Sequence, residues 1–251
     1  MHFHVPKPLH GWREFVGEVG IIVVGVLIAL SAEQLVETVH WHNEAQITRQ
    51  QLTDEVASST ADAVERVALE DCLRNRIGEL TAKLNNNEGH WAANPMKLGS
   101  ARASARVNPS MPLTYRTPTR NWTQDAWQAA KSTGMINHMN RHEIADYGDL
   151  YATIHGLALL QDQEVELAPR LSFLSFDQRL DNASRVNALM ALGQLDSVNA
   201  GMSLASRGLV EEVRQLHLKF DRGAMAKSMR GTFAAQRTLR GTCVKEMRLD
   251  F

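Results

Sequence analysis

The most strongly apolar part of the chain lies near its N-terminus. Residues 19–32 read VGIIVVGVLIALSA, fourteen residues without a charge, a proline or a strongly polar side chain. As a helix this run spans roughly 21 Å, and its apolar flanks extend it toward the ~30 Å of a bilayer's hydrocarbon core. Trp12 and Trp41 bracket the extended segment, as interfacial aromatic residues bracket a membrane span. We therefore predict a transmembrane anchor over residues 15–39.

Two other interpretations of this segment are open. A basic start, the apolar run and the small residues at 29–32 (ALSA) also resemble a signal peptide with its cleavage site. Glu14 and Glu18 precede the run and helix-compatible sequence follows it, which favours a retained anchor over a cleaved peptide. The third interpretation is a buried helix of a soluble protein.

After the anchor, apolar residues continue at helical spacing. Residues 32–84 contain no proline and one glycine, and their apolar positions recur at steps of three, four or seven. We predict that the anchor continues as a stalk helix over residues 40–84. The sequence NNNEG at 85–89 ends this helix, and the Pro-, Ser- and Arg-rich segment that follows predicts a long loop over residues 85–120.

Helical signals return in the second half of the chain. Gly134 is placed to end a helix that begins near residue 121, and Asn140 with Glu143 has the spacing of a capping box. Further helices are predicted over residues 141–166, 171–179 and 184–207, and from 209 onward. No run alternates apolar and polar residues as a strand would. The chain is therefore predicted to be all-α, with a bundle of four to six helices over residues 121–251.

The total charge is balanced, but its distribution is not. The chain carries 27 basic and 28 acidic residues, which gives no reason to expect a nucleic-acid partner. Residues 33–83 hold ten acidic and five basic residues, whereas residues 214–251 hold nine basic and three acidic ones. We predict that the basic C-terminal segment packs on the acidic stalk.

Two stretches resemble an uncharacterised bacterial family of single-pass membrane proteins. The first, GWREFVGEVGIIVVGVLIALSAEQLVE, has the family's Gly-Glu pair before an Ile/Val/Leu-rich helix that ends in Ala-Leu and a polar residue. The second is WQAAKSTGMINHM followed by YGDLYATI, with a Trp-containing helix, a Ser/Thr-Gly turn and a Tyr-containing helix. The resemblance implies a membrane anchor and no particular activity.

The flanking charges predict an orientation for the anchor. Lys7, Arg13 and the amino terminus precede it, whereas only Arg49 follows within about twenty residues. Because basic residues favour the cytoplasmic side, we expect residues 1–14 in the cytoplasm and the remainder in the periplasm, with the anchor in the inner membrane.

Cys72 and Cys243 are the two cysteines of the chain. They are too few for a disulfide-rich scaffold and too far apart for a zinc or CxxC motif. Outside the cytoplasm thiols tend to be oxidised, and two cysteines allow one intramolecular pairing. We therefore predict a Cys72–Cys243 disulfide. The alternative is two reduced, buried side chains, as in a cytoplasmic domain.

The anchor carries residues suited to helix pairing. Gly17, Gly25 and Ala29 follow one stripe of the helix, and small residues there let two backbones approach in lipid. We predict a homo-oligomer formed through this face. Glu18 directly precedes the apolar run, and we expect it to contact another membrane helix.

Candidate chemistry elsewhere is sparse. His138 and His142 have the spacing of two metal ligands on one helical face, but the capping residue Asn140 falls between them. We therefore predict no metal site and no cofactor. Phosphate-binding loops, nucleophile elbows and HExxH motifs are missing from the sequence.

These observations favour a non-enzymatic function. The leading hypothesis is a membrane-anchored periplasmic helical domain that senses, scaffolds or contacts an unknown protein partner. The alternative is a periplasmic hydrolase or transferase whose site lies between residues 85–120 and the bundle. A pocket with converging titratable groups would favour the enzyme.

Overall fold

The computed structural model describes residues 11–86, 89–96, 113–218 and 220–245. The helices are α1 (Trp12–Ala68), α2 (Glu70–Asn85), α3 (Asp125–Ser132), α4 (Arg141–Leu167), α5 (Asn182–Gln215) and α6 (Arg222–Arg240). Three short 3₁₀ helices are η1 (Met135–His138), η2 (Ala168–Ser175) and η3 (Gly241–Cys243). The strands β1 (His90–Trp91) and β2 (Gln178–Arg179) form one antiparallel pair. The all-α class with a long N-terminal helix is therefore confirmed.

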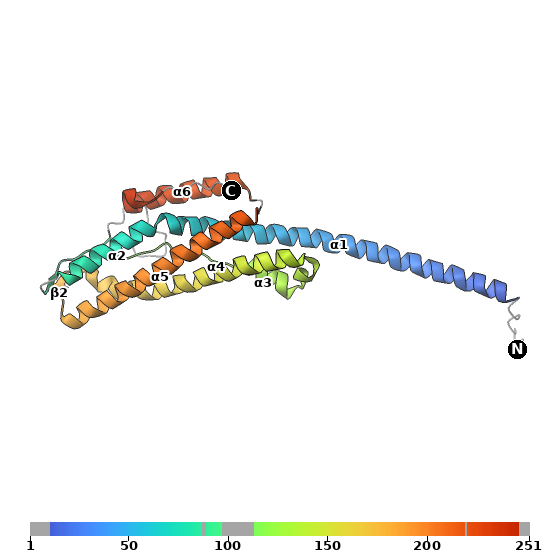
Figure 1. Cartoon of the computed structure of the whole chain (residues 1–251), viewed down its shortest axis with the longest axis horizontal. Helices are drawn as coiled ribbons and strands as arrows, with labels where there is room; N and C mark the ends of the chain where they lie inside the picture. Colours follow the sequence, from blue (N-terminus) through green and yellow to red (C-terminus); the bar gives the residue numbers. More distant parts are fainter. Residues whose placement is uncertain (1–10, 87–88, 97–112, 219, 246–251) are drawn as a thin grey trace, which may run out of the picture.

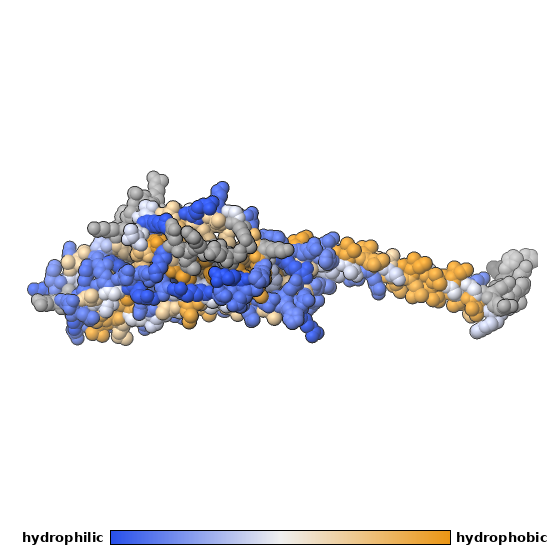
Figure 2. Space-filling model, turned by 45° about the horizontal axis from the view of Figure 1, so that its top comes forward, coloured by the Kyte–Doolittle hydropathy of each residue, from blue (hydrophilic) through white to orange (hydrophobic). Residues whose placement is uncertain are grey.

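Helix α1 has two halves with different surroundings. Its first half extends away from the rest of the molecule, and its second half enters the bundle beside α4 and α5 (Figure 1). Apolar side chains cover the extended half, whereas polar ones dominate the surface of the bundle (Figure 2). From Ala45 onward the helix contributes buried residues to the core.

The second half of α1 together with α2 is part of the bundle rather than a separate stalk. Leu52, Val56 and Leu80 are completely buried, and they pack in one cluster with α4 and α5 side chains such as Leu157 and Leu195. The apolar spacing that predicted a stalk over residues 40–84 is thus the core-facing stripe of two bundle helices. Within α1, only the few residues just before Ala45 connect the extended half to the bundle as a stalk would.

A joint at Leu69 separates α1 from α2. The Leu69 N–H still donates to the carbonyls of Glu65 (3.1 Å) and Arg66 (3.3 Å), so the helical bonding is nearly continuous there. The backbone N–H of Lys245 donates to the Ala68 carbonyl at 3.0 Å, which brings the C-terminal segment onto the joint.

The structure contains the disulfide between Cys72 and Cys243, with Cα atoms 5.2 Å apart. It joins the start of α2 to η3, next to the joint at Leu69. The same region holds an ion pair between Lys245 Nζ and Asp71 Oδ2 at 2.6 Å. The bond therefore fixes the C-terminal segment where α1 and α2 meet.

Helix α6 packs along α1 through contacts of mixed kinds. Met225 and Met229 are buried against the core. Gln236 Nε2 donates to Glu65 Oε1 at 3.0 Å, and Arg240 Nη2 donates to the Arg116 carbonyl at 2.7 Å. Buried apolar side chains and side-chain hydrogen bonds therefore act together with charge in this contact.

Both ends of the segment predicted as a loop are fixed to the bundle. Trp91 is buried, and its indole N–H donates to the Leu174 carbonyl at 2.8 Å. Arg76 of α2 donates to the carbonyls of Asn94 (2.6 Å) and Thr114 (3.0 Å). Residues 97–112 lie outside the described residues.

Local helix signals were predicted more accurately than the later helix ends. Asn140 and Glu143 form the capping box of α4, and Gly134 adopts a left-handed φ of 75° before η1. The predicted helix over residues 171–179 is instead η2 followed by β2. The predicted end near residue 207 is also wrong, because α5 continues to Gln215 and buries further apolar side chains beyond Gly208.

Removing the disulfide should destabilise the bundle. The bond closes a loop across 171 residues, for which the chain-entropy model gives about 5 kcal/mol, and measured losses are usually about 2–4 kcal/mol. For the Cys72→Ala/Cys243→Ala variant we expect a loss of that size in the free energy of unfolding, measured by urea denaturation without reductant. Reductant should shift the wild-type curve toward that of the variant. Wild-type unfolding that does not respond to reductant would contradict this account.

Candidate functional site

The extended half of α1 is the largest exposed apolar surface in the described part of the chain. Its large apolar side chains are at least two-fifths exposed, and in the most apolar stretch no residue is buried. This helix is long and apolar enough to cross a membrane. A surface of this size needs an apolar environment or a partner.

Within this half, the predicted pairing residues have open surroundings. A Cβ atom added at Gly17 or Gly25 would meet nothing within 4 Å, so neither glycine is required by packing within the chain. Ala29 and Glu18 are exposed as well. Pairing through this stripe, and a membrane contact for Glu18, therefore stay predictions about a second helix.

The predicted histidine pair is separated by a helix start. His138 lies in η1, where its ring stacks on Trp41 with centroids 4.2 Å apart and planes 6° apart. The backbone N–H of His142 donates to Asn140 Oδ1 at 2.9 Å, which makes His142 part of the α4 cap. Among the described residues, no group of three or more His, Cys, Asp or Glu side chains is arranged to hold a metal ion.

A buried cluster of charged and polar residues lies at the centre of the bundle. Arg66 of α1 and Glu164 of α4 form an ion pair, with side chains 2% and 0% exposed. Arg66 Nη2 also donates to Asn199 Oδ1 of α5 at 3.2 Å, and the Asn199 amide donates to the Tyr115 hydroxyl. These contacts connect three helices and the segment that precedes α3.

A second ion pair lies one residue earlier on α1. Arg120 donates to both oxygens of Glu65, at 2.5 and 2.6 Å, and its Nε lies 3.5 Å from Asp62 Oδ1. Gln161 of α4 holds the backbone of Arg120, accepting from its N–H at 2.7 Å and donating to its carbonyl at 2.8 Å. On the other side, Gln236 of α6 donates to Glu65. We call the residues of the two pairs and their partners the central polar cluster.

Burial changes the acidity of two carboxyl groups in this cluster. It raises the pKa of Glu164, and the Arg66 guanidinium opposes that shift by stabilising the carboxylate. Burial also raises the pKa of Asp62, from 3.8 to about 6; Arg120 lowers it and Glu65 adds to the rise. Burial likewise lowers the pKa of Arg240, which lies near Tyr115, Arg66 and Glu65.

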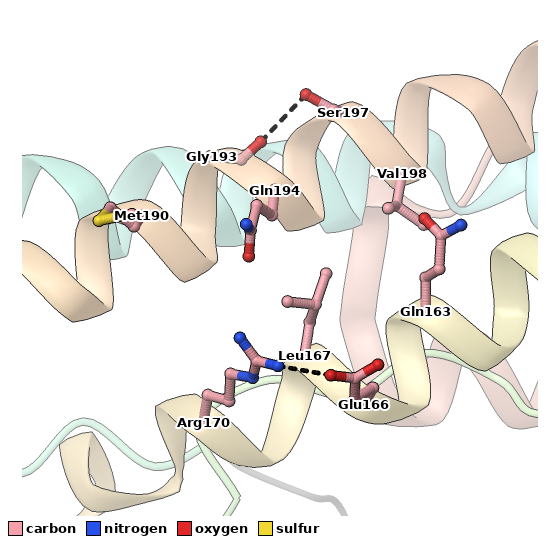
Figure 3. A pocket seen from close by; sticks show the side chains of 9 residues that line it. All are labelled: Gln163, Glu166, Leu167, Arg170, Met190, Gly193, Gln194, Ser197 and Val198. Carbon is pink, nitrogen blue, oxygen red and sulfur yellow. Dashed lines mark hydrogen bonds and ion pairs between the residues drawn. The ribbon is translucent and has the colours of Figure 1, made fainter.

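A shallow cavity lies elsewhere, between α4 and α5 (Figure 3). Its volume is about 630 Å³, and it is lined by residues of α4, η2 and α5: Gln163, Glu166, Leu167, Arg170, Met190, Gly193, Gln194, Ser197 and Val198. Its two charged residues pair with each other, Arg170 Nη2 lying 2.5 Å from Glu166 Oε1. No residue of the 85–120 segment and no member of the central polar cluster lines it.

This geometry gives the central polar cluster a structural role. Glu164 and Glu65 are buried and paired with arginines, Asp62 lies partly exposed beside Arg120, and the cavity opens at other residues. The cavity in turn offers one mutually paired acid and base instead of converging titratable groups. The arrangement can align helices, whereas acid–base chemistry needs a group that a substrate reaches.

Sequence reasoning missed this cluster, although a signal was present. On α4, Gln161 and Glu164 continue the stripe of Leu150, Ile154 and Leu157 at steps of three and four. A polar residue within such a stripe faces the core and needs a buried partner. The partner on another helix cannot be read from the stripe alone.

Comparison with protein-family models, with curated proteins and with solved structures found no match to this chain. The functional conclusion therefore depends on the sequence and geometry described above.

Breaking the buried pair from one side should be costly. Arg66→Met leaves Glu164 as an unpaired buried carboxylate, for which we expect a loss of about 3–5 kcal/mol in the free energy of unfolding, measured by urea denaturation. Arg66→Met/Glu164→Leu should recover most of that loss because both charges are gone. The control is Arg170→Met, which breaks the exposed pair with Glu166 and should cost about 0–1 kcal/mol. Equal losses for the two single variants would contradict the assignment.

The raised pKa of Asp62 predicts a pH effect on stability. A carboxyl that binds its proton more tightly in the folded state stabilises folding below its unfolded pKa of 3.8, and this contribution is lost as the pH rises through about 6. The wild type should therefore lose stability relative to Asp62→Asn between pH 4 and pH 7, as followed by thermal unfolding at several pH values. Asp54→Asn, at an exposed position of the same helix, is the matched control. A constant difference between wild type and Asp62→Asn across this range would contradict the shift.

Proposed function

We propose that this protein is a single-pass bacterial inner-membrane protein whose helical bundle lies in the periplasm and serves as an interaction or scaffolding module. The observation that carries the proposal is the extended half of α1, an exposed apolar helix of membrane-spanning length joined directly to a polar-surfaced bundle. A soluble helix with this much exposed apolar surface would be prone to association.

The disulfide supports an oxidising compartment for the bundle. Disulfides persist outside the cytoplasm and are rare within it. Both cysteines lie in the bundle, after the proposed span, so a cytoplasmic N-terminus and a periplasmic bundle agree with the pairing of Cys72 and Cys243. The excess of Lys7 and Arg13 before the span supports the same orientation.

The continuity of α1 supports a role in positioning. One helix leads from the proposed span into the core, so the orientation of the bundle is tied to that of the anchor. A module held in this way presents its surfaces at a set height above the membrane. The shallow cavity between α4 and α5, which Met190 and Gln194 help to line, is one such surface, and its partner would be a protein.

The geometry favours this function over a hydrolase or transferase. The buried carboxylates Glu164 and Glu65 of the central polar cluster are paired with arginines, and the described cavity lacks converging acids and bases. An enzyme site between residues 85–120 and the bundle would need reactive side chains there. The described part of that segment is instead held by structural hydrogen bonds.

Membrane topology provides the test. A reporter that is active only after export, fused after residue 60, should be active, and a reporter that works only in the cytoplasm should be inactive at the same position. Carbonate washing should leave the full-length protein in the membrane pellet. The control is a chain that lacks residues 1–39, which should show no export. Cytoplasmic activity of the fusion would overturn the proposal, and release of a chain about thirty residues shorter would replace the anchor by a signal peptide.

A further inference from the structure

The end of the bundle nearest the anchor carries a run without an acidic residue. Residues 126–142 read AWQAAKSTGMINHMNRH. They form most of α3, η1 and the start of α4, close to where the extended half of α1 joins the bundle (Figure 1). Lys131, His138, Arg141 and His142 are all exposed there. The run itself therefore presents two full-time cations, Lys131 and Arg141, and no carboxylate.

Trp41 sets the height of this surface relative to a bilayer. The helix from Trp12 to Trp41 is roughly 43 Å long, which matches the ~40–45 Å of a bilayer with its headgroups. The His138 ring stacks on Trp41, so η1 lies at the same level as this tryptophan. If residues 15–39 span the membrane, the turn around η1 lies at the headgroups.

We propose that residues 131–142, the membrane-facing turn, bind the headgroups of anionic lipids on the bundle side of the membrane. The proposal rests on the proposed function, because the turn reaches the headgroups only when α1 spans. The cations that make the contact are Lys131 and Arg141. Anionic headgroups attract such side chains by about fivefold in binding for each cation.

Three of the neighbouring carboxylates bind other groups. Glu143 pairs with Arg49 at 3.0 Å. Glu55 accepts the first N–H groups of α3 and the Tyr151 hydroxyl. Glu37 accepts the indole N–H of Trp41 at 3.2 Å. Within the described ranges, no carboxylate forms an ion pair with Lys131 or Arg141.

Packing against the bundle holds the membrane-facing turn in a fixed position. Trp127 of α3 stacks on Tyr151 of α4 with ring centroids 5.4 Å apart, and the Lys131 ammonium lies 5.7 Å from the centre of the Trp127 ring. Met135, the first residue of η1, and Met139, which follows its last residue, are buried. The exposed residues between them therefore have a fixed direction relative to α1.

The test is a measurement of local exposure in the full-length protein. Because both native cysteines are in the disulfide, one introduced cysteine can carry a nitroxide label. Labels at Asn137, Leu27 and Arg179 report on the turn, the span and the opposite end of the bundle. The protein is reconstituted in vesicles of phosphatidylcholine with or without phosphatidylglycerol, and collisions of each label with a water-soluble nickel chelate are measured.

In vesicles with phosphatidylglycerol we expect the label at Asn137 to be several-fold less accessible than the label at Arg179. Lys131→Glu/Arg141→Glu should restore its accessibility, as should omission of phosphatidylglycerol. Equal accessibility of these two labels, with Leu27 still shielded, overturns this inference alone. An accessible label at Leu27 overturns the proposed span as well. If the label at Asn137 is shielded equally with and without phosphatidylglycerol, or is already shielded in detergent, the lipid contact is overturned in favour of a protein contact.

Discussion

The buried pair of Arg66 and Glu164 is the constraint on which the arrangement of the bundle depends. A buried charge is tolerated only when an opposite charge lies beside it. Arg66 and Glu164 therefore allow α1 and α4 to pack in only one register. Asn199 then places α5, and Arg120 with Gln161 places the segment that leads to α3. Apolar residues supply the attraction between these helices, whereas the polar residues select which alignment they adopt.

The C-terminal segment closes this arrangement at the joint between α1 and α2. Helix α6 covers Glu65 through Gln236, and the disulfide to Cys72 holds the end of the segment in place. The contacted residues, Glu65 on α1 and Cys72 on α2, lie close together on either side of the joint. The central polar cluster and the disulfide therefore both restrict movement of the C-terminal segment away from that joint. The segment thereby excludes water from carboxylates that would otherwise be hydrated.

The sequence predicted the helical class because helix signals are local. Asn140 and Gly134 act through their own backbone neighbours, and each was found where it was expected. The role of residues 45–84 was not predicted, since an apolar stripe shows that a helix is covered without showing what covers it. Helix α5 continues past Gly208 because burial of Leu209 and Val213 outweighs a glycine cost of about 1 kcal/mol. The two ion pairs of the central polar cluster join residues 98 and 55 positions apart, a relation that spacing along one helix cannot reveal.

If α1 spans a bilayer as proposed, its unbroken course makes the protein sensitive to the thickness of that bilayer. A span that is too long for the local hydrocarbon layer tilts, and tilts of about 20° are common for such helices. From Ala45 to Ala68 the helix is roughly 35 Å long, so a 20° change would carry the joint at Leu69 sideways by roughly 12 Å. A thinner or thicker lipid domain would thus reposition the far end of the bundle without altering any contact inside it.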